Sequence, residues 1–406
     1  MRTNLLIFLL ILMSSLVMAQ KVDKVDIDNY RINITKAQFP RNYVDNENRT
    51  YTLTIKGGSS YLREYVYEKI DLRGWTEVQE NGYIDIVANL RNLTQGQGSL
   101  KTDSEQKKDK NGKVSTTYKY TVNADNTGLM TLSIYGPKNE YKKPEKKKKK
   151  KKEKEKKKEE VNPFLQDVDM TEEESVDSVL PTKELAYTTS ETFAYGVSSG
   201  EQSSAKSAWN RFNQIASTEY NSQLQTYAKG LSGAINKNIN FYYGIPLSKD
   251  WAKFKILDKD KHPEFETYQQ ACKAMKTMFE KMSYKSDIEK MRNNFHPIID
   301  YFQTIPPKYN TDNKHHKNLR ASAWYNLAQI YYYLDMPDEM IAIGNDIIKS
   351  DHDKGDGEDF VEKGTELKNE MTFFQTDTRQ MKLKQGESED VEIDEEAIEE
   401  SSDSDE

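Results

Sequence analysis

Two amphipathic segments joined by a very short turn, within residues 319–350, place the strongest constraint on the fold of this 406-residue chain. The second segment follows Asp335, which suits an N-cap, and Pro337, which suits a first helical turn. Because the turn is so short, the two segments are predicted to form an antiparallel helical hairpin. The i, i+3, i+4 and i+7 spacing of one helical face is present in Trp324, Leu327, Ala328 and Tyr331, and the second face contains Met340, Ile341, Gly344, Ile347 and Ile348.

This hairpin resembles a tetratricopeptide repeat, a helix–turn–helix unit of about 34 residues. Met340 stands where that family usually has Ala, and the turn lacks the usual Gly. The resemblance covers about one repeat length of ~34 residues and implies a helical module that binds a protein partner. An ordinary helical hairpin with an aromatic core is the alternative. The residues that match the motif, and that we expect in the helical core and partner-binding region, are Trp324, Leu327, Ala328, Tyr331 and Ile341.

Further apolar periodicity predicts a helical domain over residues 262–383. Ser286 and Glu289 form a capping box ahead of one predicted helix, and a shorter last helix is expected to close the domain. The apolar positions are Phe265, Tyr268, Cys272, Met275, Phe279 and Met282, then Ile288, Met291, Phe295, Ile298, Phe302 and Ile305, and finally Phe360, Leu367, Met371 and Phe374.

The N-terminal region reads as a first β-α-β-like unit over residues 21–137. Apolar and polar residues alternate at 30–34, 51–55 and 84–90, which predicts strands, and helical spacing appears at 61–70. The turn Gly57-Gly58-Ser59-Ser60 lacks the lysine of a phosphate-binding loop, so a structural turn is favoured. Residues 95–114 are predicted to be a loop, and 118–134 a hairpin around Asp125-Asn126-Thr127-Gly128.

A second β-α-β-like unit is expected over residues 183–250. It comprises a strand at 185–197, a long helix from Ala205 that ends at Gly230, and a short strand at 239–245. The repeated order of elements suggests a degenerate duplication. The predicted fold class is therefore α+β, with an N-terminal α/β region of two such units followed by a C-terminal helical-hairpin domain.

A lysine-rich insertion separates the two units. Residues 141–160 are mostly lysine and glutamate, residues 161–182 are acidic and polar, and neither can form a core, so 138–182 is expected to be disordered. This segment could bind a polyanion or an anionic envelope surface, or be only a solvated linker. Nucleic acid is not expected, because no aromatic residues lie between the lysines to stack on bases. The candidate polyanion-binding residues are Lys146, Lys147, Lys148, Lys149, Lys150, Lys151 and Lys152.

The two ends of the chain indicate export and solvation. Residues 1–19 read as a signal peptide cleaved after Ala19, and no later stretch is apolar enough to cross a membrane. Cys272 is the only cysteine, which excludes an intrachain disulfide and fits a periplasmic or outer-membrane-associated protein, with secretion as the alternative. The tail, residues 384–406, is expected to be disordered; residues 386–406 carry twelve acids and no base. It could solubilise the chain, bind Ca²⁺ weakly or engage the lysine segment.

No catalytic motif appears. The five histidines show no metal-ligand spacing, and no GxSxG is present, so we expect no catalytic residue, cofactor or metal. The composition and the predicted export resemble those of cell-envelope proteins of Bacteroidota-type bacteria. We therefore expect a non-catalytic exported scaffold or adaptor that binds a protein partner. The alternatives are a polyanion-binding protein acting through the lysine segment, and an enzyme of unrecognised class in the α/β region.

Overall fold

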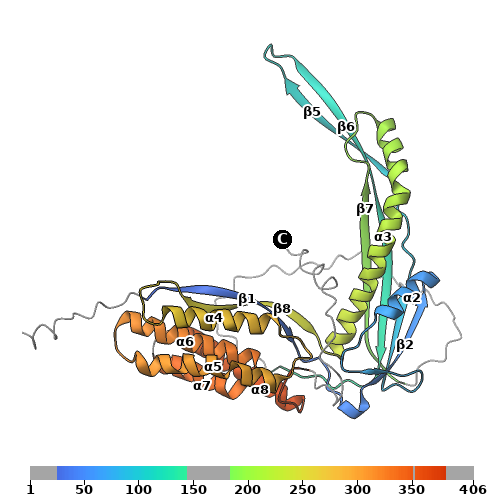
Figure 1. The fold of residues 1–406 in the computed structure, drawn as a ribbon. Helices are drawn as coiled ribbons and strands as arrows, with labels where there is room; N and C mark the ends of the chain where they lie inside the picture. The colour runs from blue at the N-terminus through green and yellow to red at the C-terminus, as the bar shows by residue number, and fades with distance from the viewer. Residues whose placement is uncertain (1–24, 144–182, 351–352, 381–406) are drawn as a thin grey trace, which may run out of the picture. The chain divides into compact units, whose positions relative to one another are not determined.

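The computed structural model describes residues 25–143, 183–350 and 353–380 (Figure 1). They divide into two compact units: a helical unit of residues up to 43, 72–74 and 237 onward, and a sheet unit of residues 44–71 and 75–236. Both helices and sheets are present, which confirms the α+β class. The predicted signal peptide, candidate residues Lys146 to Lys152 and acidic tail lie outside the described residues.

The sheet unit is organised along one long strand, β6 (Val114–Tyr135). One edge of β6 pairs antiparallel with β4 (Ile84–Leu90) and β5 (Ser99–Lys108), and β7 (Leu185–Ser198) pairs antiparallel with β6 as well. The strand β2 (Thr50–Gly57) lies parallel to β4, with α2 (Ser60–Lys69) between them in sequence. The order β2, α2, β4 is the β-α-β arrangement predicted within residues 21–137, but the strand predicted at 30–34 lies in β1 (Ile27–Ala37), which pairs outside this sheet. The short strand β3 (Thr76–Glu77) completes the sheet beside β2, and η1 (Asn46–Asn48) precedes β2.

The turn between β2 and α2 is held by hydrogen bonds from nearby side chains. Gly57 has a φ of 68°, and a Cβ there would lie 2.3 Å from the carbonyl oxygen of Leu90, so only glycine fits. The Arg63 guanidinium donates to the carbonyls of Gly57 and Gly58, and the Ser59 hydroxyl caps α2. These contacts support the structural-turn interpretation of this segment.

Two predictions for β5 and β6 were wrong. The predicted hairpin at Asp125-Asn126-Thr127-Gly128 lies in the middle of β6, where Asn126 pairs with Tyr195 and Thr127 with Ala194. A Cβ on Gly128 would lie 2.4 Å from the Tyr227 ring, so this glycine allows a helix to approach the strand. The predicted loop at 95–114 contains β5, whose residues are all exposed and therefore show no apolar alternation.

The long helix α3 (Ala205–Tyr242) also corrects the sequence interpretation. It continues past Gly230, and the predicted strand at 239–245 is wrong because Leu231, Ile235 and Ile239 extend the buried face at helical spacing. The strand that follows, β8 (Leu247–Leu257), pairs with β1 (Ile27–Ala37) and not with β7. The second β-α-β-like unit and the duplication are therefore not found in the described residues.

In the described residues, the helical unit contains the two-stranded β1–β8 ribbon, the end of α3, and the helices α4 (Phe265–Glu280), α5 (Ile288–Lys308), α6 (Lys314–Tyr333), α7 (Pro337–Lys349) and α8 (Lys354–Phe373) (Figure 1). The predicted hairpin is present as α6 and α7, and the apolar positions predicted for α4 and α5 are largely buried. The cap of α5 is Asp287 instead of Ser286, and α8 is as long as α6, not shorter.

One face of the ribbon packs on these helices. Ile32, Ile34 and Phe254 are fully buried, and the ring of Phe254 lies 5.7 Å from that of Phe279 on α4. At the free edge of β8, the buried Asn326 of α6 accepts from the backbone N–H of Lys255 at 2.7 Å and donates to its carbonyl at 2.8 Å. This amide takes the place of a neighbouring strand and ties the helical hairpin to the ribbon.

Cys272 is predicted to be unreactive in the folded protein. Its side chain is fully buried on α4, and burial raises the pKa of the thiol to about 12. Because the thiolate is the reactive form, we expect iodoacetamide to modify the native protein at least ~100-fold more slowly than the chain unfolded in guanidinium. Mass spectrometry of timed samples at pH 8 measures this; comparable rates in the two conditions would contradict the placement.

Candidate functional site

The hairpin residues singled out by the motif lie in or beside the core of the helical unit. Leu327, Ala328 and Tyr331 are buried, and Trp324 packs against the core while partly exposed. Ile341 faces Gly364 on α8, where a Cβ would lie 2.7 Å from the Ile341 side chain. These residues therefore hold the hairpin and α8 together. A partner would therefore contact other residues of the helical unit, which lie on its surface.

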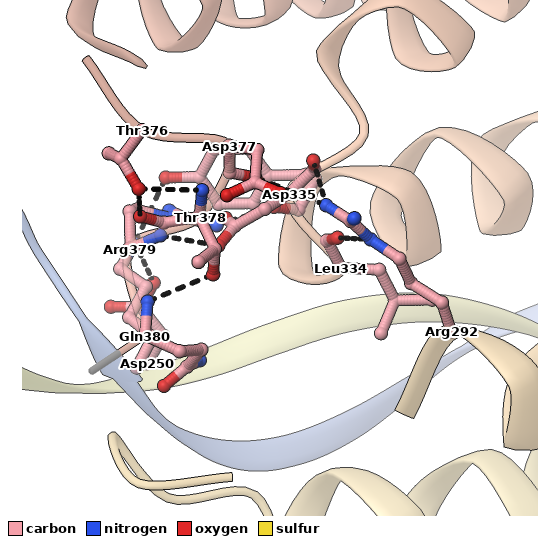
Figure 2. Close-up of polar contacts among 11 residues, drawn as sticks. Asp250, Arg292, Leu334, Asp335, Thr376, Asp377, Thr378, Arg379 and Gln380 are labelled. Atoms are coloured by element: carbon pink, nitrogen blue, oxygen red, sulfur yellow. Dashed lines mark hydrogen bonds and ion pairs between the residues drawn. The ribbon is translucent and has the colours of Figure 1, made fainter. Parts of the chain in front are cut away.

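The turn of the hairpin is built around Asp335. We predicted that this residue caps α7, but the N-cap is Met336, and Asp335 has a left-handed φ of 55°. Its side chain is fully buried, and its carboxylate accepts from the Thr378 hydroxyl at 2.8 Å and the Arg379 backbone N–H at 2.7 Å. It also forms an ion pair with Arg379 Nε at 2.5 Å (Figure 2). Asp335 thus anchors the segment 376–380, which we call the C-terminal strap.

Arg379 connects the strap to the β1–β8 ribbon. Its guanidinium donates to the Tyr332 carbonyl and lies 4.7 Å from the centre of the Tyr332 ring. Burial lowers the pKa of Arg379, but the charge interactions and hydrogen bonds with Asp335 and Tyr332 together outweigh burial and raise the pKa. Lys36 of β1 donates to the Tyr332 hydroxyl at 3.1 Å and pairs with Asp250 of β8 at 2.5 Å. One tyrosine therefore contacts both the strap and the ribbon.

Arg292 of α5 holds the other side of the same turn. Its Nε donates to the carbonyl of Leu334 at 2.9 Å, and its Nη2 donates to the carbonyls of Asp335 at 2.7 Å and Asp377 at 3.2 Å (Figure 2). The Leu334 and Asp335 carbonyls follow the end of α6, where helix geometry leaves acceptors free. The guanidinium satisfies them and fixes the strap at the same time.

A groove of about 520 Å³ lies between this turn and the C-terminal end of α8. Its apolar surface comes from Met336, Pro337 and Met371, and Lys368 pairs with Asp338 at 2.6 Å on its rim. The exposed side chains that line it include Glu339, Thr372 and Gln375. An apolar floor with charges of both signs at the rim suits an extended or helical peptide.

A second buried polar cluster surrounds Glu264, ahead of α4. Its carboxylate accepts from Lys308 Nζ at 2.5 Å, the Tyr309 hydroxyl at 2.9 Å and the Tyr301 hydroxyl at 3.1 Å. Burial raises the pKa of this carboxyl, but the three hydrogen bonds outweigh burial and leave the pKa below its ordinary value of 4.5. The carboxylate is thereby held in its charged form and joins the start of α4 to the end of α5.

This cluster predicts a loss of stability in acid. Because the folded-state pKa of Glu264 is lowered, its contribution is complete above pH 4.5 and is lost as the pH falls through the lowered value. We expect the urea midpoint of the wild type to fall between pH 6 and pH 3 more steeply than that of Glu264→Gln. Parallel slopes for the two proteins would show that Glu264 is not preferentially charged in the folded state.

Sequence reasoning missed the Asp335–Arg379 pair and Arg292. The one hint in the sequence is a charged residue, Arg379, that follows the last apolar helix. The sequence does not indicate its partner, because Asp335 lies 44 residues earlier and the pair forms no local pattern. Among the described residues, no group of three or more His, Cys, Asp or Glu side chains is placed to hold a metal ion. No helix in the described part of the chain is both long and apolar enough to span a bilayer.

Comparison with protein-family models and with curated proteins found no match to this sequence. The site must therefore be interpreted from its own geometry.

Proposed function

We propose that this protein is a non-catalytic, exported adaptor of the cell envelope that binds a protein partner with its tetratricopeptide-like helices. The observation that carries the proposal is the groove between the α6–α7 turn and α8. It combines an apolar floor, a rim of mixed charge and a volume of about 520 Å³. A peptide segment of a partner can bury apolar side chains there while its charged groups stay at the rim.

The strap supports this interpretation. The helical unit already binds a bent, non-helical segment of its own chain, through the Arg292 guanidinium and the Asp335 carboxylate, which contact backbone groups of residues 377 and 379. Recognition of a non-helical backbone by side chains on a helical scaffold is the behaviour expected of a peptide-binding module. The periplasmic or outer-membrane-associated location rests on the sequence of residues 1–20 and on the presence of a single cysteine.

Site-specific photo-crosslinking tests the groove. A photoreactive benzoylphenylalanine is placed at Thr372, which lines the groove, or at Lys363, an exposed residue of α8 outside the groove. In cells of the native host, we expect a discrete crosslinked product from position 372 and none from position 363. Adding Glu339→Lys to the protein labelled at 372 should weaken that product by altering the rim.

Two results would reject the proposal. One is the absence of any product from position 372 while the protein remains folded by circular dichroism. The other is the same product from both positions, because a partner that contacts the two sites equally does not occupy the groove.

A further inference from the structure

The outward face of the β1–β8 ribbon is basic and surrounds an exposed tryptophan. Strand alternation turns Ile32, Ile34 and Phe254 inward, which leaves Arg31, Lys249 and Lys253 exposed on the other side. Trp251, between the two lysines, is 69% exposed. In the ladder, Arg31 is opposite Lys253 and Thr35 is opposite Lys249, so the cations lie on both sides of the indole.

Within the part of the chain that the structure describes, these cations contact no counter-charge. Among the residues that the structure describes, no carboxylate lies within 4.0 Å of Arg31, Lys249 or Lys253. Lys36 and Asp250, by contrast, pair with each other on the inward side of the ribbon. Three neighbouring unpaired cations around a large exposed aromatic ring form a surface suited to an acidic segment that also carries apolar residues.

The C-terminal strap ends beside one end of this ribbon. Arg379 and Gln380 are 7% and 6% exposed, so the chain is fixed up to residue 380. The contact of Arg379 with Tyr332, and of Tyr332 with Lys36, places this point beside the end of β1 and the start of β8 (Figure 2). Lys249 lies at that end, one position from Asp250.

The sequence beyond the strap has the matching chemistry and sufficient length. Residues 387–406 hold twelve acids, with Val391 and Ile393 between acidic neighbours. The six residues between Gln380 and Glu387 can extend over about 20 Å. The face from Lys249 to Lys253 is only about 14 Å long at strand spacing, so the acidic segment reaches all of it.

We propose that the acidic tail, residues 387–406, docks on the outward face of the β1–β8 ribbon. Its carboxylates pair with Arg31, Lys249 and Lys253, and its Val391–Ile393 stretch covers the Trp251 indole. Each exposed ion pair contributes little, so docking depends on several pairs formed by a tethered segment and weakens with salt. In the docked state, the tail excludes other polyanions from this face.

Zero-length crosslinking of the full-length mature protein tests the docking. Carbodiimide joins a lysine amine to a carboxylate in contact with it, and the monomeric fraction is analysed by peptide mass spectrometry. We expect crosslinks from Lys249 and Lys253 to acids of residues 387–406, and their loss in 0.5 M NaCl. Tail crosslinks confined to the lysine segment 141–160, or absent at both lysines, would overturn the proposal.

The resonance of Trp251 gives an independent measurement. The protein is labelled with 5-fluorotryptophan, and Trp251→Phe identifies the signal. We expect deletion of 387–406 to shift this resonance, and the triple variant Arg31→Glu, Lys249→Glu, Lys253→Glu to shift it without further change on deletion. The matched variant Lys273→Glu, Lys281→Glu, Lys363→Glu, with the same net charge, should keep the response to deletion.

An unchanged resonance on deletion in the otherwise wild-type protein would refute docking. So would a Trp251 signal that responds only when anionic phosphatidylglycerol vesicles are added, because the occupant of the face would then be a lipid surface.

Discussion

Replacing Asp335 by asparagine is expected to lower the free energy of unfolding of the helical unit by about 3–5 kcal/mol. The substitution keeps a residue that tolerates the left-handed backbone of the turn, so it changes mainly the charge. It leaves the guanidinium of Arg379 buried without its counter-charge, and an uncompensated buried charge is strongly destabilising. Urea unfolding followed by helical circular dichroism measures the loss.

A matched substitution three residues later separates burial from charge. Asp338 pairs with Lys368, but its side chain is 69% exposed, so Asp338→Asn should cost about 0.5 kcal/mol or less. Adding Arg379→Met to Asp335→Asn removes the unpaired charge, and the double variant should be more stable than the sum of the two single losses predicts. A loss below about 1 kcal/mol for Asp335→Asn would show that the pair is not buried as described.

Replacing Asn326 by leucine is expected to lower the free energy of unfolding of the helical unit by about 3 kcal/mol. The leucine fills a similar volume but leaves the backbone N–H and carbonyl of Lys255 without the partners that Asn326 supplies. The contact with the Tyr268 hydroxyl at 3.1 Å is lost as well. Each buried polar group left without a hydrogen bond lowers stability by about 1–3 kcal/mol, and two backbone groups of Lys255 lose theirs, which gives the expected loss.

Gln329→Leu, one turn further along α6, provides the control. Gln329 is partly exposed and makes one long contact of 3.4 Å with the Tyr325 hydroxyl, so the same type of change should cost about 0.5 kcal/mol or less. Amide hydrogen exchange at Lys255 gives a local measurement, because its protection should fall in Asn326→Leu and not in Gln329→Leu. Equal protection in the two variants would mean that Asn326 does not cover the edge of β8.

The helices of the C-terminal unit could be predicted because each buries one face at regular spacing. Phe279, Phe295 and Leu327 are fully buried where the periodicity places them. The β1–β8 ribbon could not be predicted in the same way, since Ile32 pairs with Ala252, 220 residues away. Local pattern contains no information on such a partner, and the outward Trp251 obscures the apolar alternation of β8.

Other predictions were wrong because the same residue type can have two structural roles. Glycine often ends a helix, but Gly230 lies inside α3 and allows close packing, since a Cβ there would lie 3.1 Å from the Phe193 ring. Asp335 has the right side chain for a helix cap and instead receives the strap. The polar strand β5 has no apolar signal because its stability comes from backbone pairing with β6 and not from burial.

The pairing of β6 with β7 has a consequence for how this chain tolerates change. Tyr135 and Leu185 are register partners, and Gly136 donates to the Glu184 carbonyl, so the polypeptide leaves the sheet and returns at the same point. The entropy of closing such an excursion varies only with the logarithm of its length, about 0.6 kcal/mol per doubling. Because the two ends of the connection already lie side by side, a whole domain can be grafted between residues 136 and 184 at little cost in loop-closure entropy.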